Sequence, residues 1–217
     1  MDVSRLYRLR VRTARLELRV PTHDELVELR ELARAGVHPP ELMPFAHAWT
    51  DEPYSEQWVV AHFERRLAES RPDAWNLPLG VWAHGSLAGL QDAVAQDFAA
   101  TKAVETGSWL GMTFQRRGYG TEMRAAMLEL AFRGLGAEIA RSGYIDGNIA
   151  SQRVSDKLGY RRVGRSEVAP RGVPVGETQL ELRREDWRCP FPVKISGLEA
   201  ALPLLGVAFS SRLNREG

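Results

Sequence analysis

The pattern of apolar and polar residues predicts a strand and a helix near the start of the chain. Residues 15–20 alternate between charged and apolar side chains, which is the period of a half-buried strand. Thr22 and Glu25 have the spacing of a capping box, and apolar residues then recur at helical spacing as far as Gly36. We therefore expect a strand over 15–20 that leads directly into a helix.

The next hundred residues predict a loop, a second helix and a hairpin. Residues 38–53 are rich in proline and aromatic side chains, so we expect an ordered loop, and loops of this length often carry function. Residues 55–69 place apolar side chains on one helical face. The turn residues 84–86 separate two apolar segments, 79–82 and 87–94, which is the pattern of a β-hairpin.

Residues 104–160 alternate between strand-like and helix-like segments. We expect a strand over 104–112, a helix from Tyr119, a strand over 139–145 and a short helix that Asn148 caps. In the helix from Tyr119, apolar side chains form one stripe, and the acidic residues Glu122 and Glu129 are turned away from it. This stripe should pack on the sheet.

Composition narrows the class of protein. The chain has 217 residues, which is long enough to bury a sizeable core and suits one domain. Its 29 Lys and Arg residues nearly balance its 28 Asp and Glu residues, and a net charge of +1 gives no electrostatic reason to bind nucleic acid or an anionic membrane. We expect neither as a partner.

The sequence carries no signal for secretion, membrane insertion or metal binding. Cys189 is its one cysteine, which excludes an internal disulfide framework, and arginines recur near the N-terminus where a signal peptide needs an apolar run. The most apolar window, residues 195–209, is shorter than the ~20 residues of a spanning helix. The five histidines lack the spacing of metal ligands. We expect a cytoplasmic protein without a metal site.

A glycine-containing turn before the helix at Tyr119 is the clearest chemical signal. Its glycines leave the backbone free to take positive φ, so several N–H groups can point to one spot where a helix begins. The helix dipole and the arginines of the turn favour a diphosphate there. A dinucleotide-binding fingerprint would need glycine at the position of Met123. The turn is formed by Gln115, Arg116, Arg117, Gly118, Tyr119 and Gly120.

The order of two motifs indicates a family. The pattern Gln-x-x-Gly-x-Gly follows an apolar strand, and about thirty residues later come Asn148-Ile-Ala-Ser151 and Lys157-Leu158-Gly159-Tyr160. This arrangement resembles the GNAT superfamily of acyl-CoA-dependent N-acyltransferases, in particular the branch that includes ribosomal-protein N-terminal acetyltransferases. In that family the glycine turn binds the pyrophosphate of coenzyme A. The preceding strand splays from its neighbour and hydrogen-bonds the pantetheine arm.

The resemblance implies a set of residues that bind acyl-CoA, with acetyl-CoA as the default donor. The strand would supply backbone groups, the glycine turn would hold the pyrophosphate, and the Asn148 segment would lie near the pantetheine amides. The implied residues are Ser108, Trp109, Leu110, Gln115, Arg116, Arg117, Gly118, Tyr119, Gly120, Thr121, Asn148 and Ser151.

Three residues are candidates for the chemistry. Many members of the family carry tyrosine at the position of Ser155 to protonate the departing thiolate, and the ribosomal-protein branch resembles this chain in using serine. A serine hydroxyl can donate a hydrogen bond to a thiolate whose thiol has a pKa of about 8 to 9. Glu105 is the first candidate for a general base and Asp92 the second. An α-amino acceptor, with a pKa of about 7.7 to 8.0, hardly needs a base.

We expect an α/β fold with a mixed, mostly antiparallel twisted sheet of about seven strands and helices on both faces. Residues 161–167 and 178–182 would form the last two strands. The domain would cover residues 1–187, and residues 188–217 would form a C-terminal tail. In related proteins the segments that carry Trp49 and Trp82 line the acceptor cleft, and by that resemblance both are candidates to contact the acceptor.

The expected reaction is direct acyl transfer from acyl-CoA to a primary amine in a ternary complex. Three alternatives stay open. The donor could carry a carboxylated group such as succinyl, because one arginine near the acyl end would admit it. The acceptor could be a small amine or an aminoglycoside in place of a protein amine. The chain could also be a regulatory module that binds acyl-CoA without turning it over.

The tail contains more leucines than a disordered end needs. Leu198, Leu202, Leu204 and Leu205 lie close together, and Pro203 limits a continuous helix. We expect one short helical turn that docks either on the body of the same chain or on a second subunit of a homo-oligomer.

Overall fold

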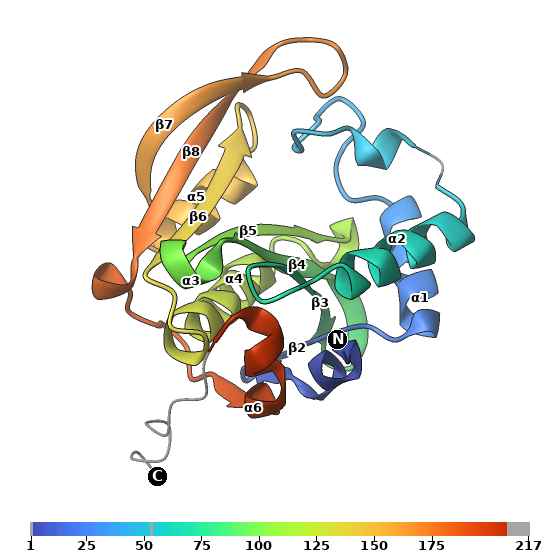
Figure 1. Ribbon diagram of the computed structural model, residues 1–217. Coiled ribbons are helices and arrows are strands. Elements are labelled where there is room, and N and C mark those ends of the chain that lie inside the picture. Colours follow the sequence, from blue (N-terminus) through green and yellow to red (C-terminus); the bar gives the residue numbers. More distant parts are fainter. Residues whose placement is uncertain (1, 53, 208–217) are drawn as a thin grey trace.

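The strands form a single twisted sheet (Figure 1), and apolar and polar residues alternate in some of them, such as β2 and β8, whereas β3 is buried almost throughout. The computed structural model describes residues 2–52 and 54–207. Across the sheet the strands follow the order β7-β8-β6-β5-β4-β3-β2-β1-β9. Their bounds are β1 Arg10–Arg12, β2 Leu16–Arg19, β3 Ala74–Ala83, β4 Ser86–Gln96, β5 Ala103–Leu110, β6 Ile139–Ile145, β7 Arg161–Val168, β8 Val175–Arg183 and β9 Lys194–Ser196.

The helices lie between the strands that the sequence predicts them to connect. Short 3-10 segments supplement them, of which η1 and η6 bear on the packing described below. The bounds are η1 Val3–Arg8, α1 His23–Arg34, α2 Glu56–Ala68, α3 Phe98–Thr101, α4 Tyr119–Glu129, α5 Ile149–Lys157, α6 Leu198–Ala201 and η6 Leu202–Leu205. A π-helical turn, Leu130–Gly134, extends α4.

The fold class is as predicted, but the sheet has nine strands where we expected about seven. The two additional strands are β1 and β9. Each is three residues long, and they pair with each other so that Val11 lies opposite Ile195. Three residues are too few to show an alternating pattern, and the pairing joins opposite ends of the chain. No local signal in the sequence could have predicted it.

One pair of neighbouring strands is parallel, and it is short. β5 and β6 pair only over Ala103–Glu105 and Ile139–Arg141, whereas the other neighbouring strands pair antiparallel. Beyond this pairing β5 stays beside β4, and β6 stays beside β8. Figure 1 shows β6, β7 and β8 as a group that rises away from β4 and β5. The two strands therefore diverge after Glu105 and Arg141, and we call this point of divergence the fork.

Helices cover both faces of the sheet, and two successive residues of β4 show this. Neighbouring side chains of a strand point to opposite faces. Gln91 is hydrogen-bonded by Arg124 of α4, while Asp92 lies 4.0 Å from Arg66 of α2. The helices α2 and α4 therefore pack on opposite faces, and α1 packs beside α2.

The acidic residues of α4 are buried, which corrects the expectation that they turn away from the core. Glu122 is 2 % exposed and Glu129 is 6 % exposed. Glu122 accepts hydrogen bonds from Thr13 and Arg15 at the β1–β2 turn, and Glu129 accepts one from the indole of Trp187 at 2.9 Å. These partners lie far away in the sequence, so helical periodicity alone could not reveal them.

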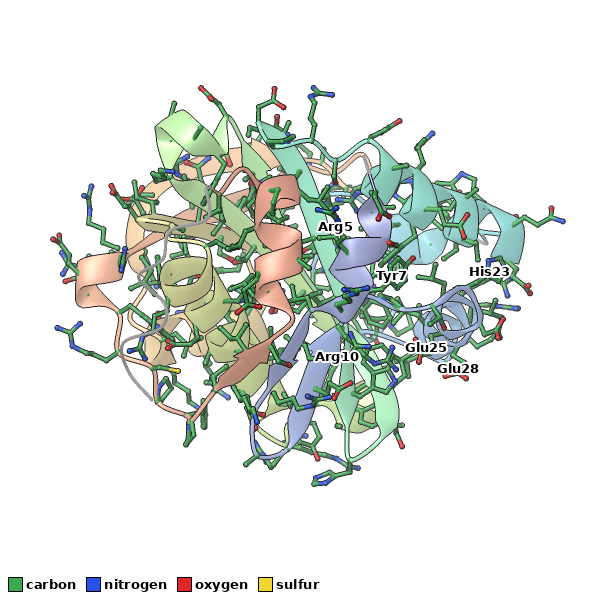
Figure 2. The ribbon with its side chains drawn as sticks, turned by 60° about the horizontal axis from the view of Figure 1, so that its bottom comes forward. Arg5, Tyr7, Arg10, His23, Glu25 and Glu28 are labelled. Carbon is green, nitrogen blue, oxygen red and sulfur yellow. The ribbon has the colours of Figure 1, made fainter. Side chains whose placement is uncertain are left out.

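The C-terminal tail packs on the body of its own chain, as one of the two expected arrangements. Its leucines at 198, 202, 204 and 205 belong to the hydrophobic core. α6 contacts η1, and Figure 2 shows the two side by side with Arg5 and Tyr7 labelled on η1. Residues 208–217 lie outside the described part of the chain. The domain boundary at Trp187 stays a prediction.

No helix within residues 2–52 and 54–207 is long and apolar enough to cross a membrane.

The packing of the tail predicts that its leucines stabilise the whole fold. Leu205 is fully buried, so Leu205→Ala should lower the free energy of unfolding by about 2 to 5 kcal/mol. Urea denaturation followed by circular dichroism measures this change. Glu199→Ala, on the exposed side of α6, is the control and should change stability by less than about 0.5 kcal/mol. Equal stability of the two variants would show that the tail docks only loosely.

Candidate functional site

The fork between β5 and β6 forms the base of the candidate site. Two hydroxyl groups bridge the strands where their pairing ends. The Thr106 hydroxyl donates to the Arg141 carbonyl at 3.2 Å, and the Ser142 hydroxyl donates to the Thr106 carbonyl at 3.2 Å. Beyond this point the edge of β5 from Gly107 to Leu110 no longer pairs with β6. An unpaired edge presents N–H and C=O groups to a ligand that contains amides.

A cleft of about 610 Å³ opens above the fork. Its walls come from the loop after α1, from β5 and β6, from the segment between β5 and α4, and from α5. Most residues predicted to bind coenzyme A lie along it. They are Ser108, Trp109, Leu110, Gln115, Arg116, Gly118, Gly120, Thr121, Asn148 and Ser151.

The glycine turn has one glycine with positive φ. Gly118 has a φ of +83° and precedes the first residue of α4, and Arg116 also has a positive φ of +61°. Gly120, in contrast, lies in the first turn of α4 with ordinary helical geometry. A Cβ added to Gly120 would stand 3.6 Å from a methyl group of Val154. Gly120 therefore leaves space between α4 and α5 and does not shape the turn.

Two residues of the turn do not reach the cleft. The carbonyl of Arg117 accepts a hydrogen bond of 3.1 Å from Arg15. Tyr119 is 6 % exposed, and the Arg15 guanidinium lies 4.9 Å from the centre of its ring. Both residues connect the turn to the β1–β2 region. Their contact with the coenzyme stays a prediction.

Gln115 and Asn148 line the cleft and also hold the loop after α1. The Gln115 amide donates to the carbonyls of Val37 at 2.6 Å and of Leu110 at 2.8 Å. The Asn148 side chain caps α5 by accepting from the N–H of Ser151 at 3.1 Å, and its amide donates to the Pro44 carbonyl at 3.4 Å. The predicted capping role of Asn148 is confirmed, and the bonds to the loop are additional.

Ser155 is buried in α5 and does not itself line the cleft. It is 1 % exposed, and its hydroxyl has no hydrogen-bond partner among the described residues. Buried hydroxyl groups are normally paired, so an unpaired one needs a partner of another kind. Val154 and Ser151, its neighbours on α5, line the cleft. A ligand group at this wall could supply the missing partner.

The two candidate bases differ in access. Glu105 is exposed and lines the cleft, and its carboxylate has no hydrogen bond or ion pair with another described residue. Asp92 does not line the cleft, and its carboxylate accepts the N–H of Gly107 at 2.9 Å. Burial raises the pKa of the Asp92 carboxyl, and nearby Arg66 opposes this shift. Glu105 is therefore the candidate that a substrate could reach.

The two tryptophans proposed for the acceptor lie in different places. The centre of the Trp49 ring lies 5.6 Å from that of Trp109, a cleft residue, and Trp49 itself does not line the cleft. Trp82 lies beneath the Arg19 guanidinium at 3.7 Å and faces a separate hollow near the β1–β2 turn. The structure therefore does not bring Trp82 to the cleft.

Charges divide along the cleft. Arg116, Arg153 and Lys157 lie on the glycine turn and on α5, and none of the three forms an ion pair with a described residue. The carboxylates of Glu105 and Glu177 lie on β5 and β8. The sequence analysis missed Arg153, Lys157 and Glu177. The spacing of four residues between the two cations of α5 was a usable signal, because such residues share a helix face.

Arg124 is a second residue that the sequence analysis missed. It is 4 % exposed and lines the cleft at the fork. Its guanidinium donates to Ser142 at 2.8 Å, to Ser108 at 2.9 Å and to Gln91 at 3.4 Å. No described carboxylate lies within 4.0 Å of it. The charge of Arg124 also acts on the buried Asp92 carboxylate from farther away and favours its ionised form. A buried cation without an anion in direct contact is costly, and an anionic ligand group would relieve this cost.

Within the described part of the chain, no three His, Cys, Asp or Glu side chains gather in a group that could hold a metal ion.

Comparison with known proteins shows which family this chain matches. The family model of the acetyltransferase (GNAT) domain matches residues 15–161, which is more than half of the chain. The matched segment runs from the strand β2 to the first residue of β7. It includes the fork, the glycine turn and α5.

Solved structures share the fold at low sequence identity. RimJ of Mycobacterium smegmatis in complex with CoA-disulfide is 17 % identical with a TM-score of 0.68, and the match covers 90 % of this chain and 91 % of that one. RimL, a ribosomal L7/L12 alpha-N-protein acetyltransferase in complex with coenzyme A, is 15 % identical with a TM-score of 0.65, covering 80 % and 97 %. The microcin C7 self-immunity acetyltransferase MccE in complex with acetyl-CoA and AMP is 18 % identical with a TM-score of 0.63, covering 78 % and 93 %.

The space at Gly120 predicts a selective effect on ligand binding. In Gly120→Ala the new methyl group meets Val154 at an ordinary contact distance, so the fold should tolerate it. The methyl group also narrows the cleft between α4 and α5. We expect the affinity for coenzyme A, measured by titration calorimetry, to fall at least about tenfold, or about 1.4 kcal/mol. Thermal denaturation is the control for folding, and unchanged affinity would contradict a ligand at this wall.

Proposed function

Because this chain belongs to the GNAT acetyltransferase family and is an acyl-CoA-dependent N-acyltransferase, we propose that it transfers an acetyl group from acetyl-CoA to the α-amino group of a protein or peptide. The name of the similar RimL protein, an alpha-N-protein acetyltransferase, supports this choice of acceptor.

The division of charge along the cleft carries the proposal. Cations without ion-pair partners at the glycine turn and on α5 suit the phosphates of the donor. The N-terminus of α4 adds its dipole at the same end. Glu105 and Glu177 suit an amine that arrives protonated. A cleft with an anion-binding part and an amine-binding part matches the two substrates of an N-acyltransferase.

Between the anion-binding part and the amine-binding part of the cleft, the fork supplies groups that can hydrogen-bond coenzyme A. β5 does not pair with β6 from Gly107 to Leu110, and side chains already bond backbone groups of these two end residues, so Ser108 and Trp109 between them would offer backbone groups to the amides of the pantetheine arm. The hydroxyl of Ser155 has no partner among the described residues, and its helix neighbours Ser151 and Val154 line the cleft, so it would serve as the hydrogen-bond partner of the sulfur where the arm passes this part of α5. Coenzyme A thus fits the residues that are present.

The reaction requires only modest assistance from the protein. The amine nitrogen attacks the thioester carbonyl, the new C–N bond forms, and the C–S bond breaks to release the thiolate. A backbone N–H near Leu110 would stabilise the oxyanion, Ser155 would donate a hydrogen bond to the thiolate, and Glu105 would accept the proton of the amine. Proximity of the two substrates supplies most of the rate.

No covalent intermediate on the enzyme is part of this proposal. Cys189 lies in the tail, does not line the cleft and donates its S–H to the carbonyl of Phe191 at 3.1 Å. Burial raises the pKa of its thiol, which makes it a poorer nucleophile at neutral pH.

A panel of acceptors tests the proposal. Purified protein with acetyl-CoA is given a peptide with a free α-amino group, the same peptide blocked at its N-terminus but with an internal lysine, spermidine and kanamycin. We expect thiol release only with the first peptide, and mass spectrometry should show one added acetyl group at its N-terminus. Turnover of spermidine or kanamycin would move the acceptor to small amines. Bound acetyl-CoA without turnover of any amine would indicate a regulatory module.

Ser155→Ala provides the matched variant for this assay. It should lower kcat by about tenfold, or about 1.4 kcal/mol, with little change in the KM for acetyl-CoA. Its stability should not fall, because the hydroxyl has no partner among the described residues to lose. Equal kcat in variant and parent would remove Ser155 from the chemistry.

Arg124 favours a second candidate function, the transfer of a carboxylated acyl group such as succinyl. The guanidinium lies at the fork beside Ser108 and has no carboxylate within 4.0 Å among the described residues. If the acyl group extends towards the fork, its carboxylate would meet this cation. An arginine–carboxylate pair in a buried site is strong and geometrically specific.

The ratio of two donors decides between the candidates. If Arg124 binds the acyl carboxylate, kcat/KM for succinyl-CoA should exceed that for acetyl-CoA, and Arg124→Gln should lower this ratio by about tenfold or more. Both kcat/KM values are measured on the same protein sample. A smaller fraction of folded enzyme would lower both values equally, so it would not change their ratio. A parent enzyme that prefers acetyl-CoA, with an unchanged ratio in the variant, would assign Arg124 a purely structural role.

A further inference from the structure

Arg171 connects two segments that are far apart in the sequence. It lies in the turn of residues 169–174 between β7 and β8. Its guanidinium donates to both carboxylate oxygens of Asp51, at 2.6 and 2.7 Å, and to the carbonyl of Pro40 at 2.8 Å. We call these three bonds the clasp. Figure 1 shows the β7–β8 hairpin reaching over towards the loop between α1 and α2.

The partner of the clasp is the loop of residues 37–51, which forms one wall of the cleft. His38, Leu42 and Phe45 of this loop line the cleft. Two further ties hold it, from Gln115 to the Val37 carbonyl and from Asn148 to the Pro44 carbonyl. The loop is therefore bonded to the glycine turn, to α5 and, through the clasp, to the β7–β8 hairpin.

The loop also packs against β5, on the face of the sheet that carries Glu105, the candidate general base. The rings of Phe45 and Trp49 are 5.0 Å apart, and that of Trp49 is 5.6 Å from Trp109 of β5. Trp109 and Glu105 are four residues apart on β5, so their side chains point to the same face. The clasp thus fixes a wall that shares this face with Glu105.

The clasp is exposed to solvent, which limits its contribution to the free energy of unfolding. The side chains of Arg171 and Asp51 are 36 % and 41 % exposed, so their pair adds little to global stability. Among the described residues, its three bonds are the only hydrogen bonds or ion pairs between residues 169–174 and the loop. The clasp is therefore the direct polar link between this turn and the loop, and its loss should have little effect on the stability of the fold.

The clasp should persist at neutral pH. Its hydrogen bonds lower the pKa of the Asp51 carboxyl below the ordinary value. A lowered pKa means that the contribution of the pair is complete at neutral pH and is lost only as the pH falls through that lowered value.

We propose that Arg171 is a positioning residue that holds residues 37–51 as the acceptor wall, so that the amine is presented to the acyl group. This inference rests on the proposed function for the nature of the acceptor. It assigns Arg171 no contact with acyl-CoA. Loss of the clasp should therefore weaken acceptor binding while donor binding and the fold stay intact.

Hydrogen exchange tests the structural part without any substrate. Arg171→Ala should speed exchange of the amides in residues 38–51 by about tenfold, with α4 and β4 unchanged. Arg165→Ala is the matched control, because Arg165 lies on the same hairpin and pairs with Asp146 outside the loop. It should leave the loop unchanged. Exchange in Arg171→Ala that equals the parent, or an equal effect of both variants, would overturn the proposal.

Kinetics test the functional part with the peptide that has a free α-amino group. Arg171→Ala should raise the KM for this peptide about fivefold to tenfold and leave the KM for acetyl-CoA unchanged. Arg171→Lys keeps the charge without the planar fork and should recover part of the loss. A changed KM for acetyl-CoA with an unchanged KM for the peptide would overturn the proposal. If the parent does not turn over the peptide, the proposed acceptor fails, and hydrogen exchange alone decides the clasp.

Discussion

The parallel pairing of β5 with β6 stops after three residue pairs, and the candidate site depends on this early stop. Each strand continues with a partner on its other side, so the divergence leaves an unpaired backbone edge inside the sheet. The Thr106 and Ser142 hydroxyls satisfy the backbone carbonyls at the point of divergence. Arg124 then fills the space beneath them. These polar side chains satisfy backbone and hydroxyl groups that the divergence of the two strands would otherwise leave buried and unpaired.

The loop of residues 37–51 couples the two ends of this cleft. Gln115 and Asn148, which the family resemblance assigns to coenzyme A, are hydrogen-bonded to carbonyls of that loop. The turn that would hold the donor and the wall that would face the acceptor therefore share side chains. Binding at the glycine turn would be transmitted to the loop through these contacts. Arg171 restrains the same loop from the opposite side.

Buried charge is used in two ways in this fold. Glu122 is buried with Arg15 and Thr13 as partners, and it joins α4 to the β1–β2 turn. Such a pair is satisfied and needs no ligand. Arg124 is as deeply buried but bonds only neutral groups. The difference separates a structural contact from a residue that could take part in binding, because among the described residues Arg124 has no carboxylate within 4.0 Å and only the more distant charge of Asp92 acts on it.

Local sequence was sufficient to predict the longer secondary-structure elements and to indicate the protein family. Periodicity predicted the longer strands and helices, and the spacing of the glycine turn and the Asn148 motif indicated the family that the comparison confirms. Tertiary structure decided what depends on distant pairing. The short strands β1 and β9, the burial of Glu122 and the bond of Arg171 to Asp51 each join residues about a hundred or more positions apart. Such contacts leave no period in the sequence, since periodicity records only which face of an element is buried and not which residue it meets.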